Sequence, residues 1–123
     1  MSRLRVLLAD DSEDIRDVAQ FALQQDGIEV VGGAADGSSA LRLAASLRPD
    51  AVILDISMAG PPVEELIAAV RSMDSPPAVV LYSGWPADHL RGPGVEIVQK
   101  GADPGALARG VRRATGREES PAG

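Results

Sequence analysis

Residues 51–58, AVILDISM, carry the pattern on which the fold depends. The four apolar residues 51–54 are followed at once by a carboxylate, Asp55. A short apolar run bounded by polar or turn residues is typical of a buried strand. Four more runs share this pattern and are predicted strands, at residues 4–9, 28–31, 78–81 and 95–98. The runs 28–31 and 95–98 each contain a glutamate, so we expect them nearer the edges of a sheet.

Segments with helical spacing alternate with these runs. Residues 13–26 place apolar side chains on one face, among them Val18 and Leu23. This stripe could face the core or form a docking edge for a partner protein, and the core is the preferred prediction. Three more helices are predicted at residues 38–47, 62–73 and 104–115. The last has Asp103 as its expected N-cap and Gly116 as its stop.

The segment between the fourth and fifth strands, residues 83–94, differs from the other connections. Its prolines and glycines leave room for only one or two helical turns, so the fourth helix is expected to be shortened. Alternating strands and helices build a parallel sheet with right-handed crossovers and helices on both faces. We therefore predict a five-stranded, doubly wound α/β domain over residues 1–116, followed by a disordered tail at residues 117–123.

Composition excludes several classes of protein. The 123 residues suit one core. The net charge of −6 argues against a nucleic-acid surface, and the absence of cysteine excludes disulfides and thiolate metal sites. No apolar run approaches the ~20 residues that span a bilayer, and the N-terminal run is too short for a signal peptide. A cytoplasmic domain that binds neither nucleic acid nor membrane is the expectation.

Residues that could take part in catalysis or ligand binding follow four of the predicted strands. Taken singly, each is explained as a turn, cap or solvent-facing residue. Ligands of open α/β sheets, however, bind outside the carboxyl ends of the strands, so these side chains are expected to meet. They are Asp10 and Asp11 after the first strand, Asp55 after the third, Ser83 and Gly84 after the fourth, and Lys100 after the fifth.

The three carboxylates predict a metal site. Two carboxylates about 4 Å apart repel each other by roughly 4 kcal/mol at an effective dielectric constant near 20. Asp10, Asp11 and Asp55 can therefore share a pocket only if one is protonated or a cation lies among them. Oxygen ligands without histidine or cysteine indicate Mg²⁺ or Mn²⁺.

The other side of the pocket suits a phosphoryl group. Lys100 is the only lysine of the chain, and its compact ammonium, the Ser83 hydroxyl and the Gly84 amide are groups that bind phosphoryl oxygens. Asp55 lies between these groups and the acidic pair. It is the predicted nucleophile, which would form an aspartyl phosphate.

Four stretches together resemble the receiver domain of bacterial response regulators, of which the single-domain chemotaxis regulator is the simplest form. They are VLLADDSED (6–14), AVILDISM (51–58), VVLYSG (79–84) and IVQKGADPGALARGVRRA (97–114). The resemblance covers roughly residues 3–115. It implies a flavodoxin-like (βα)5 fold with strand order 2-1-3-4-5.

The resemblance also implies roles for the site residues. Asp55 would accept the phosphoryl group, and Asp11 and Asp55 would coordinate Mg²⁺ with the backbone carbonyl of Ser57. Asp10 would hold the ion partly through water. Ser83 would be the hydroxyl of the switch, and Lys100 would bind the phosphoryl group.

Partners follow from the same resemblance. The donor would be a phosphohistidine on a sensor histidine kinase or a phosphotransfer protein, and phosphorylation would switch binding of an unknown output protein. Such a domain is a self-phosphorylating and self-dephosphorylating switch and not a metabolic enzyme, and it would be a monomer or weak dimer.

Some positions depart from the family pattern. Ala59 and Gly101 stand where the family usually has prolines, and Ile97 stands where it has an aromatic switch residue. With the shortened helix, these departures support an alternative: an unphosphorylated, receiver-like adaptor module. A third interpretation, an aspartyl-phosphate phosphatase, is disfavoured because Ser57 replaces the second aspartate of that signature.

Two smaller features allow alternative interpretations. Trp85 is either a packing residue that fills space beside the short helix or a gate that slows water attack on the acyl phosphate, with Tyr82 expected beside it. The glycine-rich residues 30–39 favour a turn and helix cap over a nucleotide site, because they lack the GxGxxG spacing.

Overall fold

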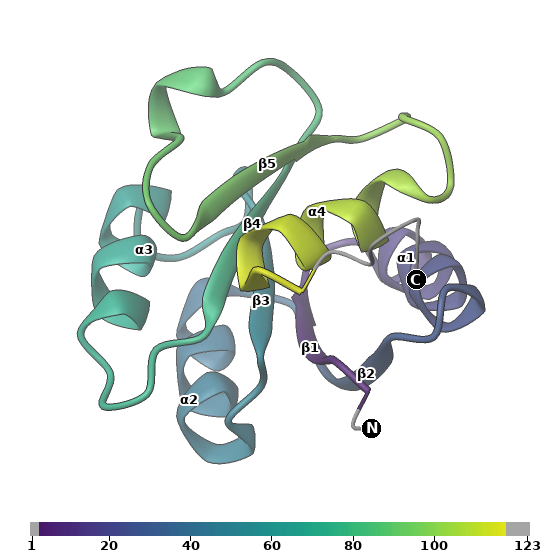
Figure 1. Ribbon diagram of the computed structural model, residues 1–123. Helices are drawn as coiled ribbons and strands as arrows, with labels where there is room; N and C mark the ends of the chain where they lie inside the picture. Colours follow the sequence, from purple (N-terminus) through teal and green to yellow (C-terminus); the bar gives the residue numbers. More distant parts are fainter. Residues whose placement is uncertain (1–2, 118–123) are drawn as a thin grey trace.

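Five parallel strands form the central sheet of the computed structural model, which describes residues 3–117 (Figure 1). The strands are β1 (Arg5–Ala9), β2 (Glu29–Ala34), β3 (Ala51–Asp55), β4 (Ala78–Ser83) and β5 (Val95–Gln99). Their order is β2-β1-β3-β4-β5, as predicted. The two strands that contain a glutamate, β2 and β5, lie at the edges, and β3 is buried along its whole length.

Helices cover both faces of the sheet. They are α1 (Glu13–Gln25), α2 (Gly37–Leu47), α3 (Val63–Arg71) and α4 (Ala106–Thr115). One core lies between the sheet and helices α1 and α4, and a second lies between the sheet and helices α2 and α3. The doubly wound α/β architecture predicted from the sequence is therefore confirmed.

The connection from β4 to β5 contains a single turn of 3-10 helix, η1 (Asp88–Leu90). This confirms the shortened fourth helix. Leu90 and Ile97 are half-buried and pack against the core under α2 and α3. A long loop thus stands beside β5 where a regular crossover would place a helix (Figure 1).

Three local predictions are wrong. Val18 is 70% exposed, because α1 buries Ala19 and Leu23 and leaves Val18 at the rim of the groove between α1 and α4. Helix α4 begins at Ala106 and not at residue 104, because Asp103 accepts a hydrogen bond from the Gly105 N–H (3.1 Å) in a turn that precedes the helix. Gly116 does end this helix, in the left-handed conformation.

The third error concerns Gly32 and Gly33, which continue β2 and do not form a turn. A Cβ on Gly32 would lie 2.8 Å from Cδ1 of Leu47, so close packing of α2 on this edge strand explains the glycine. The predicted cap is confirmed, because the Asp36 side chain accepts a hydrogen bond from the Ser39 N–H at 2.8 Å.

Helix α4 packs on the sheet through a buried glycine. A Cβ on Gly110 would lie 2.5 Å from Cγ2 of Val98. We expect Gly110→Ala to lower the free energy of unfolding by about 1–3 kcal/mol, because overpacking outweighs the better helix propensity of alanine. Urea unfolding measures the loss. Gly92→Ala, where a Cβ meets no atom within 4 Å, is the control; equal stability of Gly110→Ala and wild type would contradict the packing account.

The end of α4 marks the limit of the described chain. The Arg117 N–H donates to the Arg112 carbonyl at 2.9 Å. The rest of the predicted tail, residues 118–123, lies outside the described residues. Within residues 3–117, every helix is too short or too polar to cross a membrane.

Candidate functional site

Alternation along the strands selects the side chains that meet at one edge of the sheet. Residues two apart on a strand share a face. Leu8, Ile53, Val80 and Val98 belong to the core under α1 and α4. Each is followed two positions later by a polar residue; these are Asp10, Asp55, Tyr82 and Lys100. Four strands therefore direct polar side chains to the same end of the same face.

The Lys100 ammonium lies between two buried carboxylates. Its Nζ is 3.0 Å from Oδ2 of Asp10 and 3.2 Å from Oδ1 of Asp55. Asp10 is fully buried and Asp55 is 2% exposed, whereas the Lys100 side chain is 20% exposed. Asp11 is exposed at the mouth, and each of the three aspartates offers an oxygen within 4.8 Å of the others. The carboxylates and the lysine predicted to meet do so.

The two oxygens of Asp55 have different surroundings. Oδ1 accepts hydrogen bonds from the Ser57 N–H (3.0 Å) and the Ser57 hydroxyl (2.8 Å), and it faces Lys100. Oδ2 is buried and accepts no hydrogen bond from the described residues. The donors thus fix the carboxylate through Oδ1 and leave the lone pairs of Oδ2 free.

The charges in the pocket stabilise each other. Burial alone would raise the pKa of Asp55, but the Ser57 hydrogen bonds and Lys100 hold that pKa below its ordinary value. Burial would lower the pKa of Lys100, but contacts with Asp10 and Asp55 raise it. Both groups are charged at neutral pH. The ionised Asp55 stabilises the fold above its ordinary pKa, and this contribution is lost as the pH falls through the lower folded value.

The residues present fit a hard divalent cation. Oδ2 of Asp10 and Oδ2 of Asp55 are buried without a directed hydrogen bond, although Nζ of Lys100 lies close to the former. Lys100 supplies one positive charge against the three carboxylates of Asp10, Asp11 and Asp55. Free carboxylate oxygens and a residual negative charge are what Mg²⁺ or Mn²⁺ requires.

Ser83 is fully buried, and its hydroxyl is turned toward its own loop. The hydroxyl donates to the Trp85 carbonyl and accepts from the Trp85 N–H (3.1 Å). Within residues 3–117, no hydrogen bond joins it to Asp55 or Lys100. The Lys100 N–H donates to the Ser83 carbonyl at 2.6 Å, so the ends of β4 and β5 are tied beside the pocket. Gly84, the next residue, is exposed.

Residues 6–105 match the response regulator receiver domain. The chain belongs to this family. Among curated relatives, it is 42% identical over 82 residues to the transcriptional regulatory protein LiaR of Bacillus subtilis, covering 65% of this chain and 39% of LiaR. It is 43% identical over 83 residues to protein-glutamate methylesterase/protein-glutamine glutaminase 4 of Geobacter metallireducens, covering 66% and 23%. This receiver domain thus spans less than half the length of these relatives.

Solved structures agree with the assignment. The receiver domain of the putative response regulator NarL from Mycobacterium tuberculosis superposes with a TM-score of 0.84 at 27% identity, covering 96% of this chain and all of that one. The chemotaxis response regulator CheY4 of Vibrio cholerae gives a TM-score of 0.79 at 26% identity, covering 92% and 99%. The comparison of structures thus gives the same family as the comparison of sequences.

The aromatic residues of this receiver domain lie differently from the prediction. Trp85 is 59% exposed, so the packing interpretation is wrong. Tyr82 is half-buried with its ring beneath Lys100, whose Nζ is 5.4 Å from the ring centroid. Neither this contact nor the hydrogen bond of the Ser57 hydroxyl was predicted from the sequence. The alternation along β4 and β5 could have predicted that Tyr82 and Lys100 share a face of the sheet. No pattern in the sequence predicted the hydrogen bond of the Ser57 hydroxyl.

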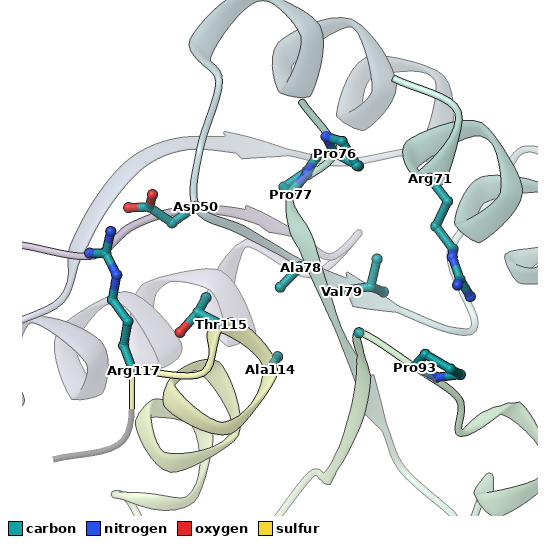
Figure 2. Close-up of a pocket in the computed structure, with 11 residues that line it drawn as sticks. Asp50, Arg71, Pro76, Pro77, Ala78, Val79, Pro93, Ala114, Thr115 and Arg117 are labelled. Carbon is teal, nitrogen blue, oxygen red and sulfur yellow. The ribbon is translucent and has the colours of Figure 1, made fainter. Parts of the chain in front are cut away.

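A hollow of about 540 Å³ lies at the opposite end of the receiver sheet (Figure 2). Ala78 and Val79, at the start of β4, lie on its floor, and Arg71 and Arg117 lie on opposite sides of it. Asp50 at its edge already accepts a hydrogen bond from the Arg5 N–H at 2.8 Å. None of the predicted site residues lines this hollow, so the carboxylate pocket remains the candidate site.

Proposed function

We propose that this receiver domain is a phosphorylation-dependent signalling switch. It accepts a phosphoryl group on Asp55 from a histidine kinase or phosphotransfer protein, with Mg²⁺, and thereby changes the binding of an output partner. The observation that carries the proposal is Oδ2 of Asp55, a buried carboxylate oxygen without a hydrogen bond whose neighbour Oδ1 is held by Ser57 and Lys100.

The residues divide the chemistry between them. Asp10, Asp11, Asp55 and the Ser57 carbonyl would hold Mg²⁺, which when bound neutralises charge on the phosphoryl oxygens. Oδ2 of Asp55 attacks phosphorus, the P–N bond of the phosphohistidine breaks, and the donor imidazole leaves with the electron pair. The nucleophile needs no base, because the low pKa of Asp55 keeps it ionised.

The product then reorganises the ends of β4 and β5. Lys100 transfers a contact from Asp55 to one phosphoryl oxygen. The Ser83 hydroxyl leaves the Trp85 carbonyl and donates to a second phosphoryl oxygen. The Gly84 amide is a further donor. These contacts favour one of two conformations of the β4 and β5 ends, which an output partner distinguishes. The domain acts as a switch: it reacts with its phosphodonor and with the water that removes the phosphoryl group, and it is not proposed to convert a metabolic substrate.

The donor is proposed to dock beside the pocket. Val18 and Phe21 of α1 are 70% and 64% exposed, and a groove of about 220 Å³ between α1 and α4 runs from Val18 to Gly101, next to Lys100. Exposed apolar patches of this kind mark protein interaction sites. With its acidic charge, the domain is proposed to act in the cytoplasm as a monomer or weak dimer, without binding nucleic acid or membrane directly.

One observation favours the alternative of an unphosphorylated adaptor. Ile97 and the single turn η1 occupy the region where the family has an aromatic switch residue and a full helix. Phosphorylation chemistry separates the two functions, because an adaptor has no use for the free oxygen of Asp55.

The test is phosphorylation by a small donor. The protein is incubated with phosphoramidate, with Mg²⁺ or with excess chelator, and analysed by intact mass and peptide mapping. We expect one phosphoryl group on the peptide containing Asp55, and at least a ~100-fold slower reaction without the metal, since three carboxylates then repel the donor. A domain that stays unmodified with Mg²⁺ present is an adaptor.

A further inference from the structure

We propose that Tyr82 is a positioning residue for Lys100: its ring holds the ammonium in place for the phosphoryl group. This inference rests on the proposed function, but the contact itself exists in the unphosphorylated protein. Nζ of Lys100 lies over the ring at 5.4 Å from its centroid, within the ~6 Å over which an aromatic face attracts a cation.

The strands fix the ring where the ammonium needs it. Tyr82 is paired with Asp55 across β3 and β4 and with Val98 across β4 and β5. The ring therefore stands between the strand that carries the acceptor and the strand that precedes Lys100. The Lys100 ammonium thus contacts two carboxylates and also lies over an aromatic face.

A flexible side chain makes this support necessary. Lysine has a four-carbon stem, and its three donor hydrogens rotate freely. In this pocket, Nζ of Lys100 lies close to Oδ2 of Asp10 but does not form a directed hydrogen bond with it. The ring restricts the ammonium without occupying any of its hydrogens, so that all three remain available to carboxylate and phosphoryl oxygens.

The composition agrees with a dedicated pair. The chain has one lysine, one tyrosine and two other aromatic residues among its 123 residues, and the lysine lies over the tyrosine. An arginine at this position would stack its planar guanidinium on the ring, and its fork would address the oxygens in a different geometry. The ring is therefore compatible with either cation, and the bonding geometry toward the oxygens is what favours lysine at this position.

The test compares Tyr82→Phe, which keeps the aromatic face, with Tyr82→Leu, which removes it. Protein labelled with ¹³C-lysine gives one Cε signal, because Lys100 is the only lysine. An aromatic ring shields nuclei above its face, so we expect upfield-shifted Hε protons in wild type and Tyr82→Phe and an ordinary shift in Tyr82→Leu. This readout requires neither metal nor phosphodonor.

Kinetics complete the test. The rate of Asp55 phosphorylation by phosphoramidate should fall about two- to fivefold in Tyr82→Leu and stay at the wild-type value in Tyr82→Phe. Mg²⁺ affinity should be unchanged in both variants, because Tyr82 contributes no ligand. Tyr82→Met replaces Tyr82→Leu if the latter does not fold.

The outcomes are distinct. An unchanged Lys100 signal on loss of the ring, or equal loss of rate in Tyr82→Phe and Tyr82→Leu, overturns the positioning role. If wild type takes up no phosphoryl group, the proposed function fails, while the lysine signal still decides whether the ring holds Lys100.

Discussion

Replacing Asp55 with asparagine should abolish phosphorylation by phosphoramidate and leave the fold intact. The amide oxygen of asparagine can still accept the Ser57 N–H and hydroxyl hydrogen bonds, which are 3.0 and 2.8 Å long in the native protein. The carboxylate oxygen Oδ2, however, becomes an amide nitrogen with no nucleophilic lone pair. The loss should be complete, because Asp55 is the carboxylate whose Oδ1 is fixed by both hydrogen bonds of Ser57 and faces Lys100, with Oδ2 left free.

Asp10 is the residue most able to contradict this expectation. It is fully buried, and its Oδ2 also lacks a directed hydrogen bond. Intact-mass analysis of Asp55→Asn with Mg²⁺ therefore has to be paired with peptide mapping. A phosphoryl group on the peptide containing Asp10 would reassign the nucleophile. The matched control is Asp74→Asn, an exposed aspartate outside the pocket, which should be phosphorylated like wild type.

Substitution of Lys100 should separate metal binding from binding of the phosphoryl group. Lys100→Ala removes a charged hydrogen-bond donor, which is worth about 1.5–3 kcal/mol, so affinity for beryllofluoride, a phosphoryl analogue, should fall about 10- to 100-fold. Mg²⁺ affinity should rise, because the ammonium competes with the metal for Asp10 and Asp55. Lys100→Arg should keep Mg²⁺ affinity within about threefold and lose about tenfold or more for beryllofluoride, because a guanidinium bonds in a different geometry.

Trp85 makes both affinities measurable. It is the only tryptophan, it lies two residues after Ser83, and its backbone bonds the Ser83 hydroxyl. Its fluorescence is titrated first with Mg²⁺ and then with beryllofluoride in wild type, Lys100→Ala and Lys100→Arg. Equal losses of both affinities in Lys100→Arg, or no loss of either, would contradict the role given to the lysine. A tryptophan that responds to neither ligand would contradict the gate interpretation and the metal site together.

The sequence predicted the fold and the meeting of the charged groups because both depend on chain-wide periodicity. Short apolar runs that end in Asp10, Asp55 and Lys100 determine the strands, and parallel strands bring their carboxyl ends to one edge. The glutamates of β2 and β5 even indicated the two edges correctly. Such patterns survive local variation in packing.

Contacts of single side chains were less predictable. Val18 belongs to the apolar stripe of α1, but whether it is covered depends on how α4 lies beside α1. Asp103 has the chemistry of an N-cap, yet an additional turn places it ahead of the helix. The orientation of the Ser83 hydroxyl depends on the path of the loop that follows it, which sequence spacing does not specify.

The single turn η1 leaves β5 with little cover on one side. Only two of its five residues are fully buried, whereas every residue of β3 is. Segments with few buried contacts open most easily, so the amides of β5 should exchange with solvent faster than those of β3. Ser83 and Lys100 stand at the ends of β4 and β5. A phosphoryl group that binds both would hold the ends of these two strands together. A partner would then recognise a more ordered β5 at the edge of the sheet, and the signal would be a change in local order and not the displacement of a helix.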